Sequence, residues 1–268
     1  MFAERVRQDL GPLRIVLIGA FILLVPIALV TSTIRLAISE TDVYDYAVRN
    51  YGAEKASDIP ESELLKANQE IRHYLNDPDS GPLAPQVVNS AGETETLFNA
   101  RETAHMADVR SLVQLMFKAQ VLAVALALTA AVLMVALGSV RALAAAALYG
   151  SVLTLAVLGL TGAVAMIGFE AFWDRFHGIA FTNNLWELNP RRDHLIQMYP
   201  EAFWQDATTV IGGFIALQAA ALGIISGLYL LFTRPRAQTA PPEPRELPER
   251  DHTPRPRLAP PNPRHYVR

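Results

Sequence analysis

The sequence predicts an all-α polytopic membrane protein with four transmembrane helices and a small, mainly helical extracytoplasmic cap. Two observations lead to this prediction. The chain contains four apolar runs, each long enough to supply the roughly 20 helical residues that cross a hydrocarbon core of ~30 Å. Between the first two runs lies a polar segment too long to be a simple loop. Because backbone groups find no water in lipid, the apolar runs must be helices.

The apolar runs divide the chain into eight segments. The first run is expected to stay in the protein as a signal anchor, because it lacks a clear small-residue cleavage signal and more spans follow it. In chain order we predict a cytoplasmic lead (1–12), a first span (13–33), an extracytoplasmic cap (34–110), a second span (111–138), a third span (142–168), an extracytoplasmic interfacial segment (169–207), a fourth span (208–233) and a disordered Pro- and Arg-rich tail (234–268).

The distribution of charge predicts the orientation. The segment 34–110 has seven Lys and Arg residues against fourteen Asp and Glu residues, whereas Arg5, Arg7 and Arg14 lie at the N-terminal end and Arg141 lies between the second and third spans. Positive residues mark the cytoplasmic side of a membrane protein. Both termini are therefore predicted to be cytoplasmic, and the two polar segments between spans are predicted to face outside.

Local signals predict two elements around the cap. Asn99 can cap a helix whose third residue is Glu102, which is the capping-box pattern, and no Pro or Gly follows until Gly138. Gln86–Asn89 and Glu93–Phe98 flank a turn-forming sequence, which favours a small β-hairpin. The cap has few apolar residues, so we expect it to lean on the membrane helices.

The turn between the second and third spans, Gly138–Arg141, is so short that these spans should form an antiparallel pair. About 28 residues on either side, at 1.5 Å each, give arms of about 42 Å. The arms end at Arg110 and Phe169, in or just above the outer headgroups. His105 and His177 each lie within about two helical turns of that level. We therefore expect these two histidines, distant in sequence, to approach one another.

The stretch Phe169–Phe203 is crowded with aromatic residues. Trp and Tyr gather where one end of a side chain is dry and the other wet, as at a membrane surface. Glu170, Asp174 and His177 stand at positions i, i+4 and i+7, so on a helix they share one face. The stretch predicts an imidazole with carboxylate neighbours at the lipid–water boundary.

Two motifs carry a resemblance to a known family. Glu102–Leu112 reads ETAHMADVRSL, and Phe176–Phe181 reads FHGIAF. The second motif continues with Asn184, Trp186, Pro190, Asp193, Leu195, Ile196 and Pro200. The first resembles the E-x-x-H-M-x-D-V-K/R-x-L signature of the bacterial lipoprotein intramolecular transacylases, and the second resembles that family's other signature. The resemblance covers roughly residues 1–233, although Asn184 and Asn189 stand where acidic residues are expected in many members.

The resemblance implies an acyltransferase at the outer face of the bacterial cytoplasmic membrane. Members of the family move the sn-2 acyl chain of a lipoprotein's diacylglyceryl group onto the α-amine of its N-terminal cysteine. Two histidines serve that reaction, and by motif they correspond to His105 and His177. The implied partners are membrane lipids and diacylated lipoprotein N-termini. We expect no cofactor, no metal and no nucleic-acid partner, and the oligomeric state is left open.

The available residues suit this chemistry. Aminolysis of an ester needs a neutral amine, and an N-terminal amine has a pKa near 8. Imidazole titrates in the range that lets it act as a base and then as an acid. The chain has no cysteine, which excludes a thioester intermediate. We predict that His177 is the general base, oriented by Asp174 or Glu170, and that His105, with Glu102, acts as acid or holds the oxyanion. The two roles could be exchanged.

Other interpretations stay open beside this one. Phe176, Phe181, Asn184 and Trp186 are assigned to substrate binding, yet aromatic clusters are most often interface anchors. His105, Asp108, Asp174 and His177 are of types that bind zinc, which would suit a metal-dependent lipid hydrolase. A non-catalytic membrane scaffold or assembly protein is a third interpretation, favoured if the two rings lie far apart or face bulk water.

Overall fold

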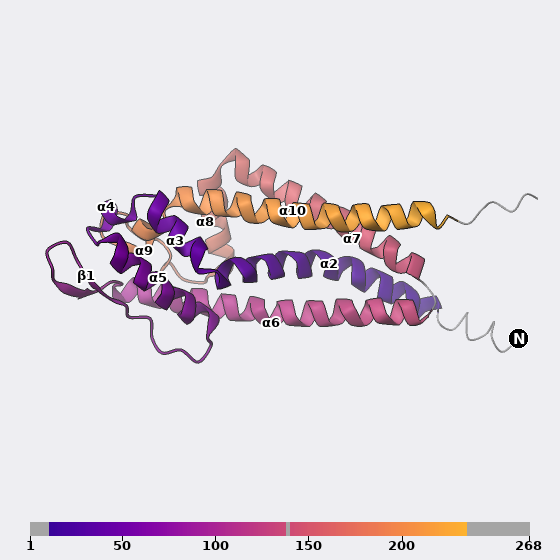
Figure 1. Ribbon diagram of the computed structural model, residues 1–268, viewed down its shortest axis with the longest axis horizontal. Coiled ribbons are helices and arrows are strands. Elements are labelled where there is room, and N and C mark those ends of the chain that lie inside the picture. The colour runs from indigo at the N-terminus through magenta and orange to yellow at the C-terminus, as the bar shows by residue number, and fades with distance from the viewer. Residues whose placement is uncertain (1–10, 138–139, 235–268) are drawn as a thin grey trace, which may run out of the picture. The chain divides into compact units, whose positions relative to one another are not determined.

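Four long helices lie side by side, and the shorter elements gather at one end of them (Figure 1). The computed structural model describes residues 11–137 and 140–234. The predicted tail beyond Arg234 and most of the predicted cytoplasmic lead lie outside the described residues. The long helices are α2 (Gly11–Ser39), α6 (Ala100–Ala136), α7 (Val140–Ile167) and α10 (Glu201–Phe232).

All four long helices are long and apolar enough to cross a membrane. α6 has 37 residues, which at 1.5 Å per residue is about 55 Å and well beyond the ~30 Å of the hydrocarbon core. The predicted fold class, an all-α membrane protein with four membrane helices, is confirmed. The helices run further than the predicted spans, since α2 continues to Ser39 and α10 already begins at Glu201; the span boundaries themselves stay predictions.

The helix α2 packs against both α6 and α7, whereas α6 and α7 contact each other only sparsely. The second and third spans, predicted to form an antiparallel pair, thus have only a small contact with each other, because α2 packs against both. The face of α7 with small residues turns toward α2 and α10. A Cβ atom at Gly150 on α7 would lie 2.8 Å from Cβ of Val25 on α2, and one at Gly223 on α10 would lie 3.3 Å from Cβ of Ser151 on α7. Small residues allow such close contact between membrane helices.

Replacing Gly150 by alanine is expected to lower the thermal stability, because the new methyl group would force α2 and α7 apart. Overpacking of this kind costs about 1–3 kcal/mol, or about 2–10 °C in melting temperature. The measurement is thermal unfolding of the purified protein in detergent. Gly159→Ala on the same helix is the matched control, since its Cβ would meet nothing within 4 Å. Equal melting temperatures for the two variants would contradict the close α2–α7 contact.

The cap consists of short elements around its own apolar core. In chain order they are α3 (Thr41–Asn50), α4 (Ala53–Ser57), α5 (Glu61–Asn76), the strands β1 (Gln86–Val88) and β2 (Thr94–Thr96), and α9 (His194–Met198). The strands pair antiparallel, with Val87 opposite Glu95, as the turn sequence predicts. Ile59, Leu64 and Met198 are fully buried in this core. Since Met198 belongs to α9, the segment after the third span completes the cap.

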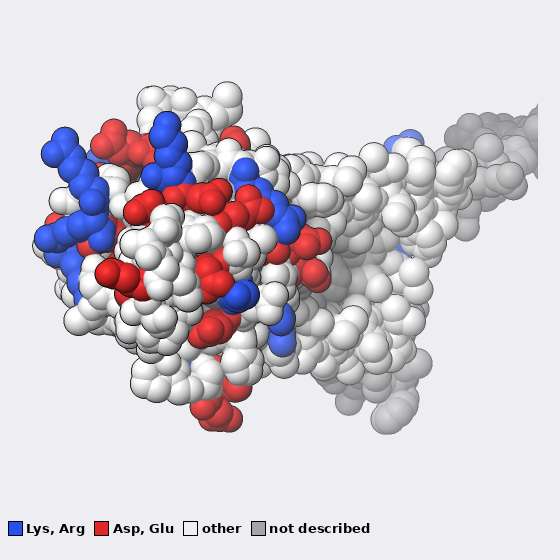
Figure 2. Space-filling model, turned by 60° about the vertical axis from the view of Figure 1, so that its left-hand side comes forward, with Lys and Arg blue, Asp and Glu red and all other residues white. Residues whose placement is uncertain are grey.

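Charged side chains gather on the cap, and the helical stretch beyond it presents a surface almost free of them (Figure 2). Arg141 lies at the start of α7, where its Nη1 donates to the carbonyl oxygen of Leu230 and to Oγ1 of Thr233, each at 3.0 Å. This places a cation at the C-terminal end of α10, which the helix dipole favours. An uncharged band between two charged ends is the pattern expected of membrane helices.

Candidate active site

Two elements bring the histidines together. α8 (Phe169–Ala180) follows α7 after a single residue, Gly168, and carries His177; the first turns of α6 carry His105. The centroids of the two imidazole rings lie 6.2 Å apart, and both side chains are buried. The predicted proximity of the two rings is therefore present in the structure.

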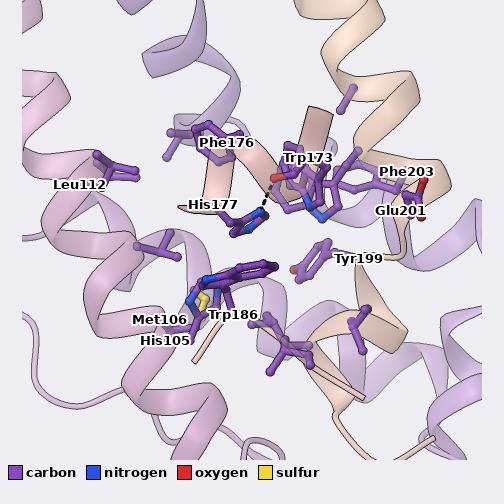
Figure 3. A pocket seen from close by; sticks show the side chains of 18 of the residues that line it. His105, Met106, Leu112, Trp173, Phe176, His177, Trp186, Tyr199, Glu201 and Phe203 are labelled. Carbon is purple, nitrogen blue, oxygen red and sulfur yellow. Dashed lines mark hydrogen bonds between the residues drawn. The ribbon is translucent and has the colours of Figure 1, made fainter. Parts of the chain in front are cut away.

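Both rings line a cavity of about 900 Å³ between the cap and the membrane helices. Most of the lining is apolar and comes from α2, α6, α8 and α10. The cavity reaches as far as Met116 on α6 and Ile211 on α10. A cavity of this size and character is typical of a small-molecule or lipid site. Figure 3 shows the two histidines facing it from different helices.

The ring of His177 is held by its neighbours. Its Nδ1 lies 2.8 Å from the carbonyl oxygen of Trp173 (Figure 3), and because a carbonyl oxygen only accepts, Nδ1 carries the hydrogen. In the neutral ring Nε2 then has the free lone pair. The indole of Trp186 stacks on the imidazole at a centroid distance of 4.9 Å and an interplanar angle of 22°. The carbonyl bond, and not Asp174 or Glu170, fixes the tautomer, so that part of the sequence prediction is wrong.

Asp174 and Glu170 do reach the cavity, on the exposed side of α8. Burial lowers the pKa of His177 below its ordinary value, while the Trp173 carbonyl and the charge of Asp174 oppose this shift. Desolvation disfavours the charged imidazolium. His177 is therefore set to be neutral at physiological pH, as a proton acceptor must be.

His105 has a buried nitrogen without a partner. Its Nδ1 is buried and accepts or donates no hydrogen bond within the described residues. The ring of Phe181 meets the imidazole edge-on at 5.2 Å. Leaving a buried polar atom unpaired costs about 1–3 kcal/mol, and such atoms in native proteins are normally paired. This one lies beside the cavity, where a bound molecule can supply the partner.

Glu102 does not assist His105. Its side chain is fully buried, but it points away from the cavity: Oε2 accepts from the backbone N–H of Asn99 at 2.9 Å and Oε1 from that of Leu195 at 2.6 Å. The first bond completes the predicted capping box of α6. The second ties α6 to α9. Both oxygens are thus used by backbone donors, which corrects the predicted catalytic role.

The four residues assigned to substrate binding separate into two groups. Phe176, Phe181 and Trp186 line the cavity. Asn184 does not; its carbonyl oxygen accepts from Nη2 of Arg101, which also donates through Nε to the carbonyl of Leu185 at 3.3 Å. The carbonyl of Asn184 therefore belongs to the tether that holds the Trp186 loop on α6, and Asn184 is not among the residues that line the cavity.

Sequence reasoning missed several lining residues. The carbonyl of Trp173 has no signal in a sequence motif, because every residue has a carbonyl. Met106 follows His105 in the sequence and also lines the cavity; this could be known only from the orientation of α6 about its axis. Tyr199 lines the cavity with its ring while its hydroxyl donates to Oδ1 of Asn68 at 2.6 Å. The many aromatic residues in Phe169–Phe203 indicated a functional segment, but they did not predict which aromatic rings contact one another.

The zinc interpretation named His105, Asp108, Asp174 and His177 as candidate ligands. Within residues 11–137 and 140–234, no three His, Cys, Asp or Glu side chains are grouped so that they could hold a metal ion. Asp108, one of the candidate ligands, accepts a hydrogen bond from Nδ2 of Asn183 at 2.9 Å. Its carboxylate helps to tether the same loop as Arg101.

A comparison with protein families decides the membership of the chain. Residues 19–204 match the model of the family described as lipoprotein intramolecular transacylase Lit. The chain belongs to the Lit family. An uncharacterized protein of Aquifex aeolicus is a relative of this Lit-family chain, 24% identical over 200 residues that cover 74% of this chain and 84% of the relative.

Solved structures of Lit from Bacillus cereus share the fold of this Lit-family protein. One has a TM-score of 0.71 at 17% identity and covers 83% of this chain and 97% of its own. A variant of the same protein in which a histidine is replaced by arginine gives a TM-score of 0.67 at 17% identity, with coverage of 87% and 97%. At such identity the likeness shows the fold, which is that of a membrane-integral protein.

Proposed function

We propose that this protein is a lipoprotein intramolecular transacylase in which His105 and His177 move the protons. The substrate is the diacylated N-terminus of a lipoprotein, and the product carries one acyl chain as an amide on its N-terminal cysteine. The proposal rests on family membership together with one observation of this chain. That observation is the unpartnered, buried Nδ1 of His105 beside the ring of His177, in a largely apolar cavity.

The cavity suits a fatty ester at the membrane surface. The end of the cavity that is farthest from the cap reaches Met116. Met116 lies 20 residues before the end of α6 at Ala136, which at 1.5 Å per residue is about 30 Å, the thickness of the hydrocarbon core. An acyl chain can therefore lie in the bilayer while its ester carbonyl enters the cavity. The histidines stand on the cap side of that level, where the polar groups of the substrate lie.

The proton balance needs only the two imidazoles. The cysteine amine attacks the ester carbonyl carbon, the new C–N bond forms, and the amine proton passes to Nε2 of His177. The tetrahedral adduct then collapses, the bond from carbon to the glyceryl oxygen breaks, and that oxygen takes up a proton from a histidine. His105 donates a hydrogen bond to the oxyanion or relays the proton from His177 to the leaving oxygen, so both imidazoles are neutral again at the end. Because both reacting groups belong to one molecule, proximity supplies much of the acceleration.

The orientation follows from the positive charges. Arg14 and Arg141 lie near the end of the helices away from the cap, so the cap and the cavity are proposed to face the outside of the bacterial cytoplasmic membrane and both termini the cytoplasm. Mature lipoprotein N-termini are exposed on that side. The scaffold interpretation gives no role to the buried Nδ1 of His105, which has no hydrogen-bond partner among the described residues.

The test is to express the protein in a bacterial strain that lacks lipoprotein N-acylation. Mass spectrometry of a lipoprotein N-terminus should show one acyl chain moved from the glyceryl oxygen to the cysteine amine, with no change in total mass. A metal-dependent hydrolase would instead remove the acyl chain, and a scaffold would leave the diacyl form unchanged. Either of these results would refute the proposal.

The rate should respond to pH in two steps. Burial places the pKa of His177 below its ordinary value of about 6.5, so its base form persists from alkaline pH down to that lowered value. Between pH 8 and 6.5 only the amine, with a pKa near 8, should slow the reaction. Below the lowered pKa of His177 the rate should fall more steeply. The measurement is the rate of acyl transfer in detergent against pH.

The variant Asp174→Asn tests the same assignment. The charge of Asp174 raises the pKa of His177, so its removal should shift the steep part of the profile to lower pH. Glu187→Gln, another exposed carboxylate at the cavity, serves as a control because it does not act on the pKa of His177. A shift to higher pH in Asp174→Asn would show that the titrating base is another group.

A further inference from the structure

A second, smaller hollow lies on the other side of α6. Its volume is about 330 Å³. It is lined by Pro78, Arg110, Ser111, Gln114, Leu115 and Lys118. None of these residues lines the large cavity, so the hollow is separate from the candidate active site. We call it the α6 groove.

The α6 groove lies at the depth of the lipid headgroups. Lys118 stands 18 residues before Ala136, or about 27 Å from the inner end of α6 at 1.5 Å per residue. That is close to the outer limit of a ~30 Å hydrocarbon core. Arg110 stands 8 residues earlier, about 12 Å further out. A lysine at this depth extends its ammonium group toward the headgroups, and so the two cations bracket the layer in which phosphates lie.

The guanidinium of Arg110 is held in place. Its Nη1 donates to the carbonyl oxygen of Ser80 at 2.7 Å and to Oγ of Ser80 at 2.9 Å. The guanidinium carbon lies 4.4 Å from the centroid of the Tyr74 ring. These contacts leave other donors of the fork available and fix its direction, which lowers the entropy lost when an anion binds.

No carboxylate neutralises these two cations. In the part of the chain that the structure describes, neither Arg110 nor Lys118 forms an ion pair with Asp or Glu. The nearby Asp77 is engaged elsewhere, with its Oδ1 accepting from the backbone N–H of Asp79 and its Oδ2 lying 3.7 Å from Nε2 of His73. Arg110 and Lys118 therefore face one hollow, and neither is paired with a carboxylate in the described residues.

We propose that the α6 groove binds the phosphate group of an anionic phospholipid in the leaflet next to the cap. Arg110 and Lys118 supply the charge; the hydroxyl of Ser111 is not part of the site, since it donates its hydrogen to the carbonyl oxygen of Ala107 at 2.9 Å. The acyl chains of this lipid would lie along Leu115 and the apolar face of α6 below it. Such a lipid would be an annular ligand that anchors α6 at a fixed depth, and its binding does not depend on the transacylase activity.

The experiment measures lipid binding to the full chain. The purified protein in detergent is titrated with dioleoyl-phosphatidylglycerol, and bound lipid is counted by native mass spectrometry. One cation near an anionic headgroup contributes about 1 kcal/mol, so Lys118→Gln should weaken binding about fivefold. Lys118→Arg should restore it. Lys55→Gln, which removes the same charge from the exposed surface of α4 in the cap, should bind as the unaltered protein does.

Two further arms identify the source of the phosphate. Dioleoylglycerol has the same chains without the phosphate, and it should bind equally to the unaltered protein and to Lys118→Gln. Inorganic phosphate in millimolar excess should not displace the phospholipid. The proposal is overturned if Lys118→Gln binds the phospholipid as tightly as the unaltered protein, if dioleoylglycerol binding also depends on Lys118, or if inorganic phosphate displaces the lipid.

Discussion

Replacing His177 by alanine should slow acyl transfer by about 10²- to 10⁴-fold, the range for loss of a positioned general base. The ring is buried, its Nδ1 is bonded to the Trp173 carbonyl, and Nε2 is left as the only proton acceptor of the neutral ring. The substitution should leave KM nearly unchanged, because the apolar lining of the cavity binds the acyl chains. The measurement is the initial rate on a diacylated lipopeptide in detergent micelles.

His105→Ala should have an effect of similar size, and the double variant should be little worse than either single one. Residues that act as a unit in one proton transfer are not additive. His73→Ala is the matched control: this histidine is exposed on α5, far in sequence from both motifs, and its Nε2 lies 3.7 Å from Oδ2 of Asp77. If both single variants kept more than a tenth of the rate, proton transfer by this pair would be ruled out.

The position of the two histidines could be predicted because it depends on helix length. A rise of 1.5 Å per residue and a short inner turn fix the height at which each arm ends, and both histidines lie close to that height. The lateral arrangement of the helices could not be predicted in this way. The small residues of α7 pack against α2 and α10 and not against α6. Which helices pack together depends on the shape of their surfaces, and a hydropathy pattern does not contain that information.

The orientation of single side chains could not be predicted for a different reason. A motif places Asn184 and Trp186 on the same loop, yet the structure uses the backbone carbonyl of Asn184 to bind Arg101, while the indole of Trp186 stacks on His177. Nor does a motif show that a backbone carbonyl, from Trp173, fills the role expected of a carboxylate. These choices depend on packing between segments that are distant in sequence, which a linear motif does not contain.

Glu102 shows how one residue can satisfy a local and a distant signal at once. The capping box with Asn99 was readable from the sequence, because its partners stand three residues apart. The second oxygen accepts a hydrogen bond from the N–H of Leu195, 93 residues away. No sequence motif predicts a bond over that separation. Since the first motif also contains His105, proximity in sequence suggested a catalytic partnership that the buried geometry does not allow.

The large effect expected at Glu102 is therefore on stability. Glu102→Ala removes the acceptor of two backbone N–H groups, and a hydrogen bond to a charged group contributes about 1.5–3 kcal/mol. The cost of burying the carboxylate offsets part of this, so we expect a loss of about 3 kcal/mol and a melting temperature lower by about 6–12 °C. Glu70→Ala, an exposed glutamate on α5, should change the melting temperature by about 1 °C or less.

The rate of the folded variant separates this structural role from a catalytic one. Well below its melting temperature, Glu102→Gln should transfer the acyl chain at close to the unaltered rate, because glutamine keeps one acceptor oxygen for the Leu195 or Asn99 N–H and neither oxygen of Glu102 reaches the cavity. A partner of His105 in proton transfer would instead show a 10²-fold loss or more with an unchanged melting temperature. The first outcome makes Glu102 a structural residue that holds the N-terminal turn of α6 on the first residues of α9.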